Sequence, residues 1–438
     1  MMNPHAVLAT RVQNFVWALV IFIVVWAPIP LGSNRSWSML FLAAVCFLAV
    51  SAALWGEKPR IAQTKPDQVY RTLLLVFAAL PFFQLLPLPF AFPHREFLEV
   101  SAEGWRAITV DQQGTLEVGL FRAGAIALSL VLLLALGETE RRNALVSVMV
   151  FSASVISLYG LAVFFAESGN WITGQIAIQV SQGVSGTFVN KNHFAGYLVL
   201  IMPFAIVTAL TRGNREPLSS LRTTFQLLAL SVLLVAFLFS GSRGGLVAFF
   251  GGLLVSLLLL GPSLGGRRVM SLKTVAVVAL CIASAILVAW DFYSAKSFTL
   301  LRPMQWIDTL DLLKQGWLWG YGAGTYDLVY PSVKSAELGY LRYDHAHNDF
   351  LEIFVTYGVI GFLSLIAAFF FVLKLAFAAT RSGRKFHQAP ILFAGVWSLS
   401  SFVLHGVVDF NFQIPANFLI FFLIMSITVS AAKAELDK

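Results

Sequence analysis

The stretch FLEIFVTYGVIGFLSLIAAFFFVLKLAF, residues 350–377, decides the fold class of this chain. A helix that crosses a membrane needs about 20 mainly apolar residues, and this stretch is longer than that. At 1.5 Å per residue it would extend about 40 Å, which exceeds the roughly 30 Å of a hydrocarbon core. We therefore predict a membrane-spanning helix that is either tilted or protrudes from the membrane.

Comparable apolar stretches recur along the whole chain. Of its 438 residues, 58% are hydrophobic and 12% are charged, against roughly 25% charged in an average soluble domain, so a soluble fold is excluded. We predict an all-α integral membrane protein, one polytopic domain over residues 1–438. The first apolar run is followed by Pro28 and Pro30 without a small-residue cleavage pattern, so we interpret it as an uncleaved span. About twelve spans are predicted, at residues 15–31, 39–55, 72–92, 118–136, 145–165, 194–210, 224–239, 246–260, 274–290, 350–377, 390–404 and 415–430.

The positions of the basic residues predict the topology. A net charge of +8 would suit a nucleic-acid partner, but the cations gather at every second turn between spans. This is the positive-inside pattern, which places both termini in the cytoplasm and leaves no reason to expect nucleic-acid binding. The cations of the inward turns are Lys58, Arg60, Lys65, Arg71, Arg141, Arg142, Arg212, Arg215, Arg222, Arg267, Arg268, Lys273, Arg381, Arg384 and Lys385.

Three outward segments are long, whereas the inward turns are short. They are residues 93–117, 167–192 and 291–346. Loops carry sites more often than the scaffold does, and the third segment is far longer than a connection requires. We predict that this extracytoplasmic loop, residues 291–346 between the ninth and tenth spans, carries part of the active site.

Two stretches of that loop have a recognisable pattern. Residues 303–314 place Trp306 and Leu310 opposite Asp308, which predicts an amphipathic helix along the membrane surface. Residues 316–326 are rich in glycine and aromatic residues. A nucleotide-binding glycine loop would need a strand and a helix around it, and neither is predicted here. The stretch therefore indicates a packed turn or an aromatic wall for a sugar.

The loop re-enters the membrane through DHAHNDFLE, residues 344–352. Placing ionisable groups in or near the membrane costs free energy. The presence of several such groups therefore indicates a functional role. A neutral histidine can accept a proton near pH 7, and either His345 or His347 could be a general base. Two other interpretations stay open. The residues could only cap and solvate a helix, or His345, Asp349 and Glu352 could share a helical face and bind a divalent ion.

Other polar clusters lie on the same outward side. Residues 184–193 lead into the sixth span, where Asn192 could cap the helix, and residues 405–411 end the eleventh. Arg243 lies at a tight outward turn, where it either snorkels to the interface or binds an anionic group bidentately. Further outward cations that could converge with it are Lys191, Arg302 and Arg342.

The compartment limits the chemistry of such a site. An outward site normally lacks nucleotide-sugar donors, so a lipid-linked substrate fits better. A lipid pyrophosphate leaving group needs positive charge where negative charge develops. The outward loops contain no Asp-x-Asp pair of the kind that metal-dependent glycosyltransferases use, and arginine would take its place.

A longer motif links this chain to a known family. Residues 347–361 read His, Asn, nine residues and then Gly-Val-Ile-Gly, a complete match to the pattern of the O-antigen ligase branch. Residues 187–193, 242–245 and 405–411 are also similar to segments common in the O-antigen ligase and polymerase superfamily. The chain resembles this superfamily over roughly residues 186–417, and the motif favours the ligase branch.

The resemblance implies a metal-independent, inverting glycosyltransferase without a cofactor in the bacterial inner membrane, its active site facing the periplasm. The donor would be a glycan on undecaprenyl pyrophosphate, and His347 would be the base. Arg243 and Arg302 would stabilise the departing pyrophosphate. The acceptor would be lipid A core for a ligase, a second lipid-linked glycan for an O-antigen or exopolysaccharide polymerase, or a protein. Candidate substrate-binding residues are Lys191, Asn190, His193, His345, Asn348, Asp349, Arg342, His405 and Asp409.

A glycan-lipid flippase or another transporter is the rival from a different class. The helix count and the outward cations favour it. However, a transport path usually needs polar groups near the membrane midplane, and Arg122 and Glu352 are the nearest ionisable groups of this kind. We therefore favour a glycosyltransferase.

Overall fold

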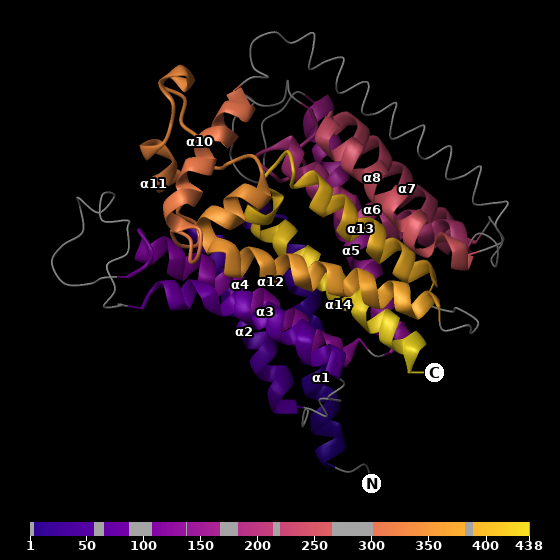
Figure 1. Ribbon diagram of the computed structural model, residues 1–438. Helices are drawn as coiled ribbons and strands as arrows, with labels where there is room; N and C mark the ends of the chain where they lie inside the picture. Colours follow the sequence, from indigo (N-terminus) through magenta and orange to yellow (C-terminus); the bar gives the residue numbers. More distant parts are fainter. Residues whose placement is uncertain are drawn as a thin grey trace.

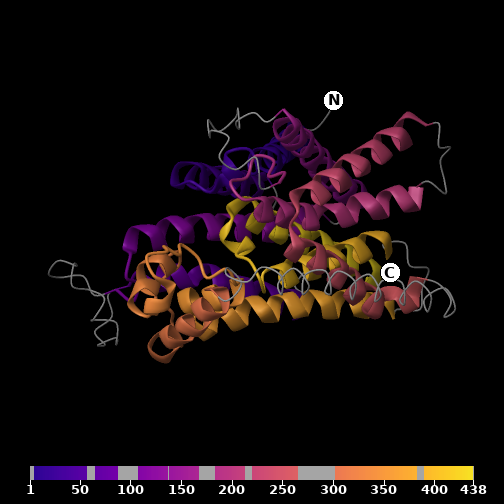
Figure 2. The same cartoon turned by 90° about the horizontal axis from the view of Figure 1, so that it is seen from above.

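The computed structural model describes residues 4–56, 65–86, 107–136, 138–166, 183–212, 220–264, 301–381 and 389–437. Over these residues the chain is helical and has no strand, which confirms the predicted all-α class. The long helices pack into one bundle, and α10 and α11 lie at one end of it (Figures 1 and 2). The helices are α1 (Pro4–Trp26), α2 (Ser36–Gly56), α3 (Lys65–Gln84), α4 (Gln112–Ala135), α5 (Thr139–Phe165), α6 (Lys191–Arg212), α7 (Leu221–Ser240), α8 (Arg243–Leu264), α10 (Leu301–Gly316), α11 (Tyr326–Val329), α12 (Asp349–Thr380), α13 (Ala389–His405) and α14 (Pro415–Leu436), with short 3-10 helices η1 (Leu31–Ser33), η4 (Tyr330–Ser332), η5 (Ala336–Leu338) and η6 (Asn411–Gln413).

Eight of the described helices are long and apolar enough to cross a membrane, namely α2, α4, α5, α6, α7, α8, α12 and α14. Shorter apolar helices lie within α1, α3 and α13. Each predicted span coincides with one of these helices except residues 274–290, which lie outside the described residues. One predicted end is wrong, because α1 stops at Trp26, two residues ahead of Pro28, and proline disfavours a helical conformation in the residue before it. Helix α3 ends at Gln84, and residues 87–92 of the predicted span lie outside the described residues.

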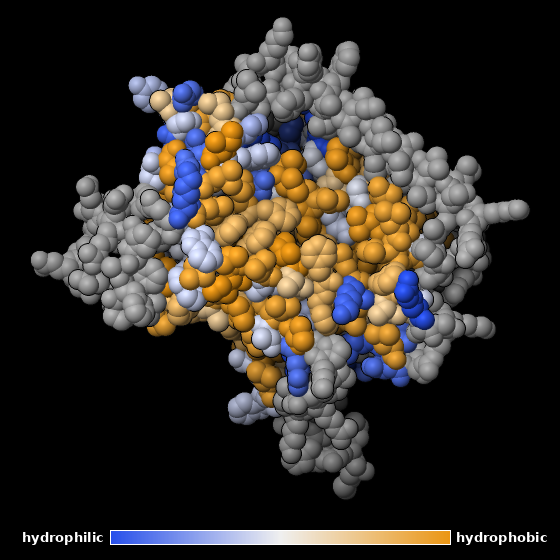
Figure 3. Space-filling model, viewed as in Figure 1, coloured by the Kyte–Doolittle hydropathy of each residue, from blue (hydrophilic) through white to orange (hydrophobic). Residues whose placement is uncertain are grey.

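The sides of the bundle carry an apolar surface, and the more polar residues lie toward its edges (Figure 3). Large apolar side chains such as Phe151 and Phe370 are more than half exposed. In a membrane, hydrocarbon chains cover such residues, and only the backbone must satisfy its hydrogen bonds internally. The surface therefore agrees with the multi-pass membrane protein predicted from the composition.

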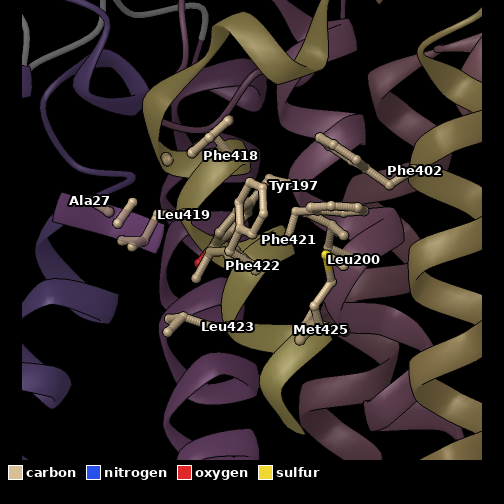
Figure 4. Packing of buried hydrophobic residues seen from close by; sticks show 14 of the residues in the cluster. Ala27, Tyr197, Leu200, Phe402, Phe418, Leu419, Phe421, Phe422, Leu423 and Met425 are labelled. Carbon is tan, nitrogen blue, oxygen red and sulfur yellow. The ribbon is translucent and has the colours of Figure 1, made fainter. Parts of the chain in front are cut away.

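Helix α14 forms the centre of the bundle. Its apolar window is buried throughout, and it packs against α4, α6, α12 and α13. Phe421 and Phe422 project from it on the side of Tyr197 of α6, and Phe421 lies beside Phe402 of α13 (Figure 4). The Phe402 and Phe421 rings lie 5.3 Å apart. This packed core holds the turn between α13 and α14 in a fixed position.

The overlong apolar stretch of the sequence is resolved by a break in α12. Gly358 has φ 64° and ψ −175°, which interrupts the helix. The Leu318 carbonyl oxygen lies against Gly358 where a Cβ would be, and the Val359 N–H donates to the Trp317 carbonyl (2.7 Å). Only glycine adopts this backbone conformation readily. Residues 316–326 are therefore a packed turn, one of the two interpretations of that stretch.

Helix α10 confirms the predicted helix at residues 303–314 but not its polar face. Asp308 is buried and accepts hydrogen bonds from the Tyr330 hydroxyl (3.2 Å) and from the backbone and side chain of Ser335 (2.9 Å each). Leu310 is 49% exposed. The prediction was wrong because buried hydroxyl and amide partners make the burial of a carboxylate acceptable. Helix α10 thus turns a polar face toward α11 and the loop that follows.

Candidate functional site

The segment that contains His347 lies between the α10 end of the bundle and the start of α12. The Gln305 side chain donates to the His345 carbonyl (2.8 Å), and the Trp306 indole donates to the Ala346 carbonyl (2.9 Å). His347 has φ 49°, a conformation uncommon for residues other than glycine. Such strain persists only where the surroundings enforce it, and it clusters at functional sites. Helix α10 therefore fixes the loop so that it holds a strained histidine.

The ring of Phe410 joins three of the predicted site histidines. His345 stacks on it with 4.2 Å between ring centroids. His347 and His193 meet it edge to face, at 4.8 and 4.4 Å. We call these three histidines and Phe410 the histidine cluster. Residues 193, 345, 347 and 410 come from three segments far apart in the sequence, and the structure brings them together at one point.

Asp409 and His405 extend the histidine cluster. Asp409 is buried, its carboxylate lies 3.5 Å from His193 Nε2, and the Phe410 N–H donates to it (2.9 Å). Burial alone would raise the pKa of this carboxyl, but His193 and His405 outweigh burial and hold the pKa below its ordinary value. His405 is buried, and its Nδ1 has no hydrogen-bond partner. Asp409 is therefore a carboxylate fixed among imidazole rings.

The cations predicted for this site fall into two groups. Arg302 of α10 donates to the Val408 carbonyl (2.9 Å) and lies near enough to His347 for its charge to act on that ring. Arg243 opens α8, where its neighbour Gly244 is packed against Val408 and His405. Arg302 and the start of α8 thus both meet the turn that follows α13.

Lys191 and Arg342 occupy different surroundings. Lys191 approaches the turn between α7 and α8, since a Cβ on Gly241 would lie 3.7 Å from its ammonium nitrogen, and its charge interacts with that of Arg243. Arg342 is 80% exposed and pairs with Asp344 (2.8 Å) and Asp327 (3.5 Å). Lys191 therefore joins the Arg243 side of the site, and Arg342 lies at the outer rim.

His345 and His347 differ in protonation although only Ala346 separates them. Burial lowers the pKa of His347 to about 4, and the nearby Arg302 charge adds to this effect. Burial also acts on His345, but the Glu352 carboxylate, 2.8 Å from its Nδ1, raises the pKa of His345 above the ordinary value. At neutral pH His347 is therefore a neutral base, whereas the Glu352 carboxylate favours the protonated form of His345.

Three of the predicted substrate-binding residues have structural partners. Asn348 caps α12 by accepting from the Phe350 and Leu351 N–H groups (3.0 and 3.1 Å). Asp349 is buried, and its carboxylate accepts from the Phe412 N–H (3.1 Å). Asn190 accepts from the Asn192 N–H (2.8 Å), so the cap of α6 is Asn190 and not Asn192 as predicted. These contacts hold the loops around the histidine cluster.

The alternative metal site does not assemble among the described residues. His345 precedes α12 and so shares no helical face with Asp349 and Glu352. The Asp349 carboxylate contacts Phe412, whereas the Glu352 carboxylate binds His345 and the Ala346 N–H (2.9 Å). Within the part of the chain that the structure describes, no three His, Cys, Asp or Glu side chains are grouped as a metal site requires.

Sequence reasoning missed the residues that organise the site. Phe410 was given no role within the polar segment 405–411, although its ring contacts three histidines. Gln305 and Trp306 hold the loop backbone, and Gln84 of α3 donates to the carbonyls of Trp319 (2.7 Å) and Thr356 (2.8 Å) at the break in α12. A glutamine at the end of an apolar helix was the available signal for Gln84, since a buried amide needs partners.

One comparison with known proteins matches this region. Residues 228–366 match the family model described as O-antigen ligase. The matched segment runs from within α7 into α12 and contains Arg243, Arg302, His345 and His347. No curated protein matches the chain.

Proposed function

Because its residues 228–366 make this chain a member of the O-antigen ligase superfamily, we propose that it transfers a glycan from undecaprenyl pyrophosphate to lipid A core. The transfer would take place at the periplasmic face of the bacterial inner membrane, toward which the α10 end would point. The observation that carries the proposal is His347, a neutral and strained imidazole beside Arg302. A general base and a fixed cation are the two groups that this reaction needs.

His347 would act on the acceptor. As the acceptor hydroxyl oxygen attacks the anomeric carbon of the donor, His347 takes the hydroxyl proton. The new glycosidic C–O bond forms while the bond from the anomeric carbon to the pyrophosphate oxygen breaks, and the pyrophosphate leaves with that electron pair. Attack opposite to the leaving group inverts the anomeric carbon. Neutral His347 can accept this proton, whereas the Glu352 carboxylate favours the protonated form of His345 and makes it the poorer base.

Arg302 and Arg243 would stabilise the departing pyrophosphate. Both are guanidinium groups, which stay charged and bind phosphate oxygens in a planar, bidentate way. Arg302 is oriented by the Val408 carbonyl, and Lys191 adds positive charge beside Arg243. We propose that these side chains supply the positive charge in a metal-independent transfer. Removing one such group from a preorganised site typically lowers the rate about 10²- to 10³-fold.

The proposal is tested with purified protein in proteoliposomes that contain undecaprenyl-pyrophosphate glycan. Lipid A core and a second lipid-linked glycan are offered as separate acceptors, with and without chelator. The variants are His347→Ala and, as the matched control, Tyr340→Ala, which removes a fully exposed ring from the same loop. We expect transfer to lipid A core that resists the chelator, is lost in His347→Ala and is retained in Tyr340→Ala.

The other outcomes have distinct meanings. Glycan lengthening without transfer to lipid A core would replace the ligase proposal by a polymerase. Translocation of the lipid-linked glycan without any transfer would replace it by a transporter. Full transfer by folded His347→Ala protein would remove the role of His347.

A further inference from the structure

A cavity adjoins the histidine cluster, because His345 is part of its wall. Its volume is about 270 Å³. The cavity lies between the start of α2, the middle of α4, the turn before α11, the start of α12 and η6. Its inner wall includes Arg122, Glu352 and Gln413, and Arg35, Ser36 and Asp344 lie at its outer edge. Arg122 and Glu352 are the two ionisable groups that the sequence places within apolar stretches, so the cavity gives them a common location.

The inner wall has hydrogen-bonding capacity that the protein does not use. Arg122 is buried, donates to the Gln413 side-chain oxygen (2.6 Å) and lies over the Tyr357 ring at 4.9 Å. This fixes the orientation of Gln413, whose amide nitrogen is buried without a hydrogen-bond partner. A buried polar atom without a partner is unfavourable.

The cavity is adjacent to His347 but separate from it. His345 lines the cavity and stacks on Phe410, and the Phe410 ring meets His347. His347, Arg243 and Arg302 do not line the cavity. A ligand in the cavity would therefore lie across the stacked pair of His345 and Phe410 from the proposed pyrophosphate side.

The lining selects a small polyhydroxylated ligand. The wall contains a side chain that donates, Arg35, and side chains that accept, Asp327 and Asp344, together with apolar side chains such as Phe121. Ligand pockets for drug-sized molecules are usually about 300 to 1,000 Å³, so this cavity is suited to one sugar ring. Sugar hydroxyls both donate and accept hydrogen bonds, so they can pair with a wall that contains both donors and acceptors.

We propose that this cavity binds one sugar residue of the acceptor, next to the residue whose hydroxyl is glycosylated. The inference rests on the proposed function, because the cations assigned to the donor pyrophosphate lie outside the cavity. An acceptor held there by one sugar ring presents the neighbouring ring to His347. The cavity would thus determine which acceptor is used.

The first test is kinetic and uses Ser36→Trp, which places an indole at the exposed edge of the cavity. Ser231→Trp is the matched control, because Ser231 is an exposed residue of α7 far from the cavity. In the proteoliposome assay we expect Ser36→Trp to raise the acceptor KM at least 10-fold. The donor KM should stay within 2-fold, and Ser231→Trp should resemble wild type. An unchanged acceptor KM, or a raised donor KM instead, would overturn the assignment.

The second test measures binding and does not depend on catalysis. His347→Ala protein in nanodiscs is titrated with methyl glycosides of hexoses, heptoses and uronic acids, and bound sugars are detected by saturation-transfer NMR. We expect at least one neutral glycoside to give a signal that disappears when Ser36→Trp is added to His347→Ala. The proposal is contradicted if every glycoside is silent or the signal persists in the double variant. A wild-type protein that binds glycosides but transfers nothing would instead contradict the proposed function.

Discussion

His345 and His347 contact the same ring, that of Phe410, but have different surroundings. His345 lies flat on the ring and pairs with the Glu352 carboxylate, which raises its pKa. His347 meets the edge of the same ring, its Nδ1 has no partner, and burial with Arg302 keeps it neutral. Two histidines of one motif thus differ, because one is paired with a carboxylate and the other is a free base. Neighbouring groups, rather than position in the chain, assign the chemistry.

The largest expected effect separates these two histidines directly. His347→Gln should lower kcat about 10²- to 10⁴-fold, because it removes a base that acts only in the transition state. His345→Gln should lower kcat by less than about 10-fold, because its ring positions Phe410 and lines the proposed acceptor cavity but does not take the proton. Steady-state transfer assays at saturating donor and acceptor measure both. Equal losses in the two variants would break the comparison, since both rings would then act on the substrate.

Phe410→Ala should remove the ring that both histidines share. Truncating a buried phenylalanine typically costs about 3 to 5 kcal/mol, and Phe410 is 8% exposed. Phe410→Leu, which keeps much of the apolar volume, should cost about 1.5 kcal/mol or less. The free energy of unfolding in detergent, measured by urea titration of tryptophan fluorescence, compares the two. If both variants were as stable as wild type, Phe410 would not support the histidine cluster.

The break in α12 packs the backbone around Gly358 against the turn at Leu318. Gly358→Ala should destabilise the protein by roughly 2 to 4 kcal/mol, because a Cβ would meet the Leu318 carbonyl and the positive φ is unfavourable for alanine. Gly339→Ala is the matched control. Its φ is also positive, at 57°, but no atom lies within 4 Å of the added Cβ, so we expect about 1 kcal/mol. Thermal unfolding of both variants separates strain from close contact, and equal Tm shifts would show that contact with the Leu318 turn is unimportant.

Features that depend on the local sequence could be predicted, whereas features that depend on contacts between distant segments could not. Apolar length predicted the helices, because each span must satisfy its backbone alone within a membrane. The pattern from His347 to Gly361 located the loop, whereas the break at Gly358 was not predicted, because a tilted or protruding helix was expected there. The two histidine environments were not predictable, because Glu352 contacts His345 one turn into α12 and Arg302 reaches the site from more than forty residues away. The buried face of α10 also depended on partners, Tyr330 and Ser335, that periodicity does not encode.

The smallest effect is a pair of opposite pH dependences in stability. The pKa of His347 falls from 6.5 to about 4 on folding, so the unfolded chain binds its proton first, and stability is lost as pH falls from 6.5 toward 4. The pKa of His345 rises above 6.5 on folding, so its contribution is present below pH 6.5 and is lost as pH rises through the folded pKa. At about 1.36 kcal/mol per pKa unit, the complete His347 shift corresponds to roughly 3 kcal/mol. Tm is measured from pH 4 to pH 9. We expect His347→Gln to weaken the fall of Tm at acid pH, and His345→Gln to weaken the fall of Tm at alkaline pH. If either variant weakened the opposite fall instead, the assignment of the free base and the carboxylate-paired histidine would have to be exchanged, and with it the side of Phe410 on which the acceptor is deprotonated.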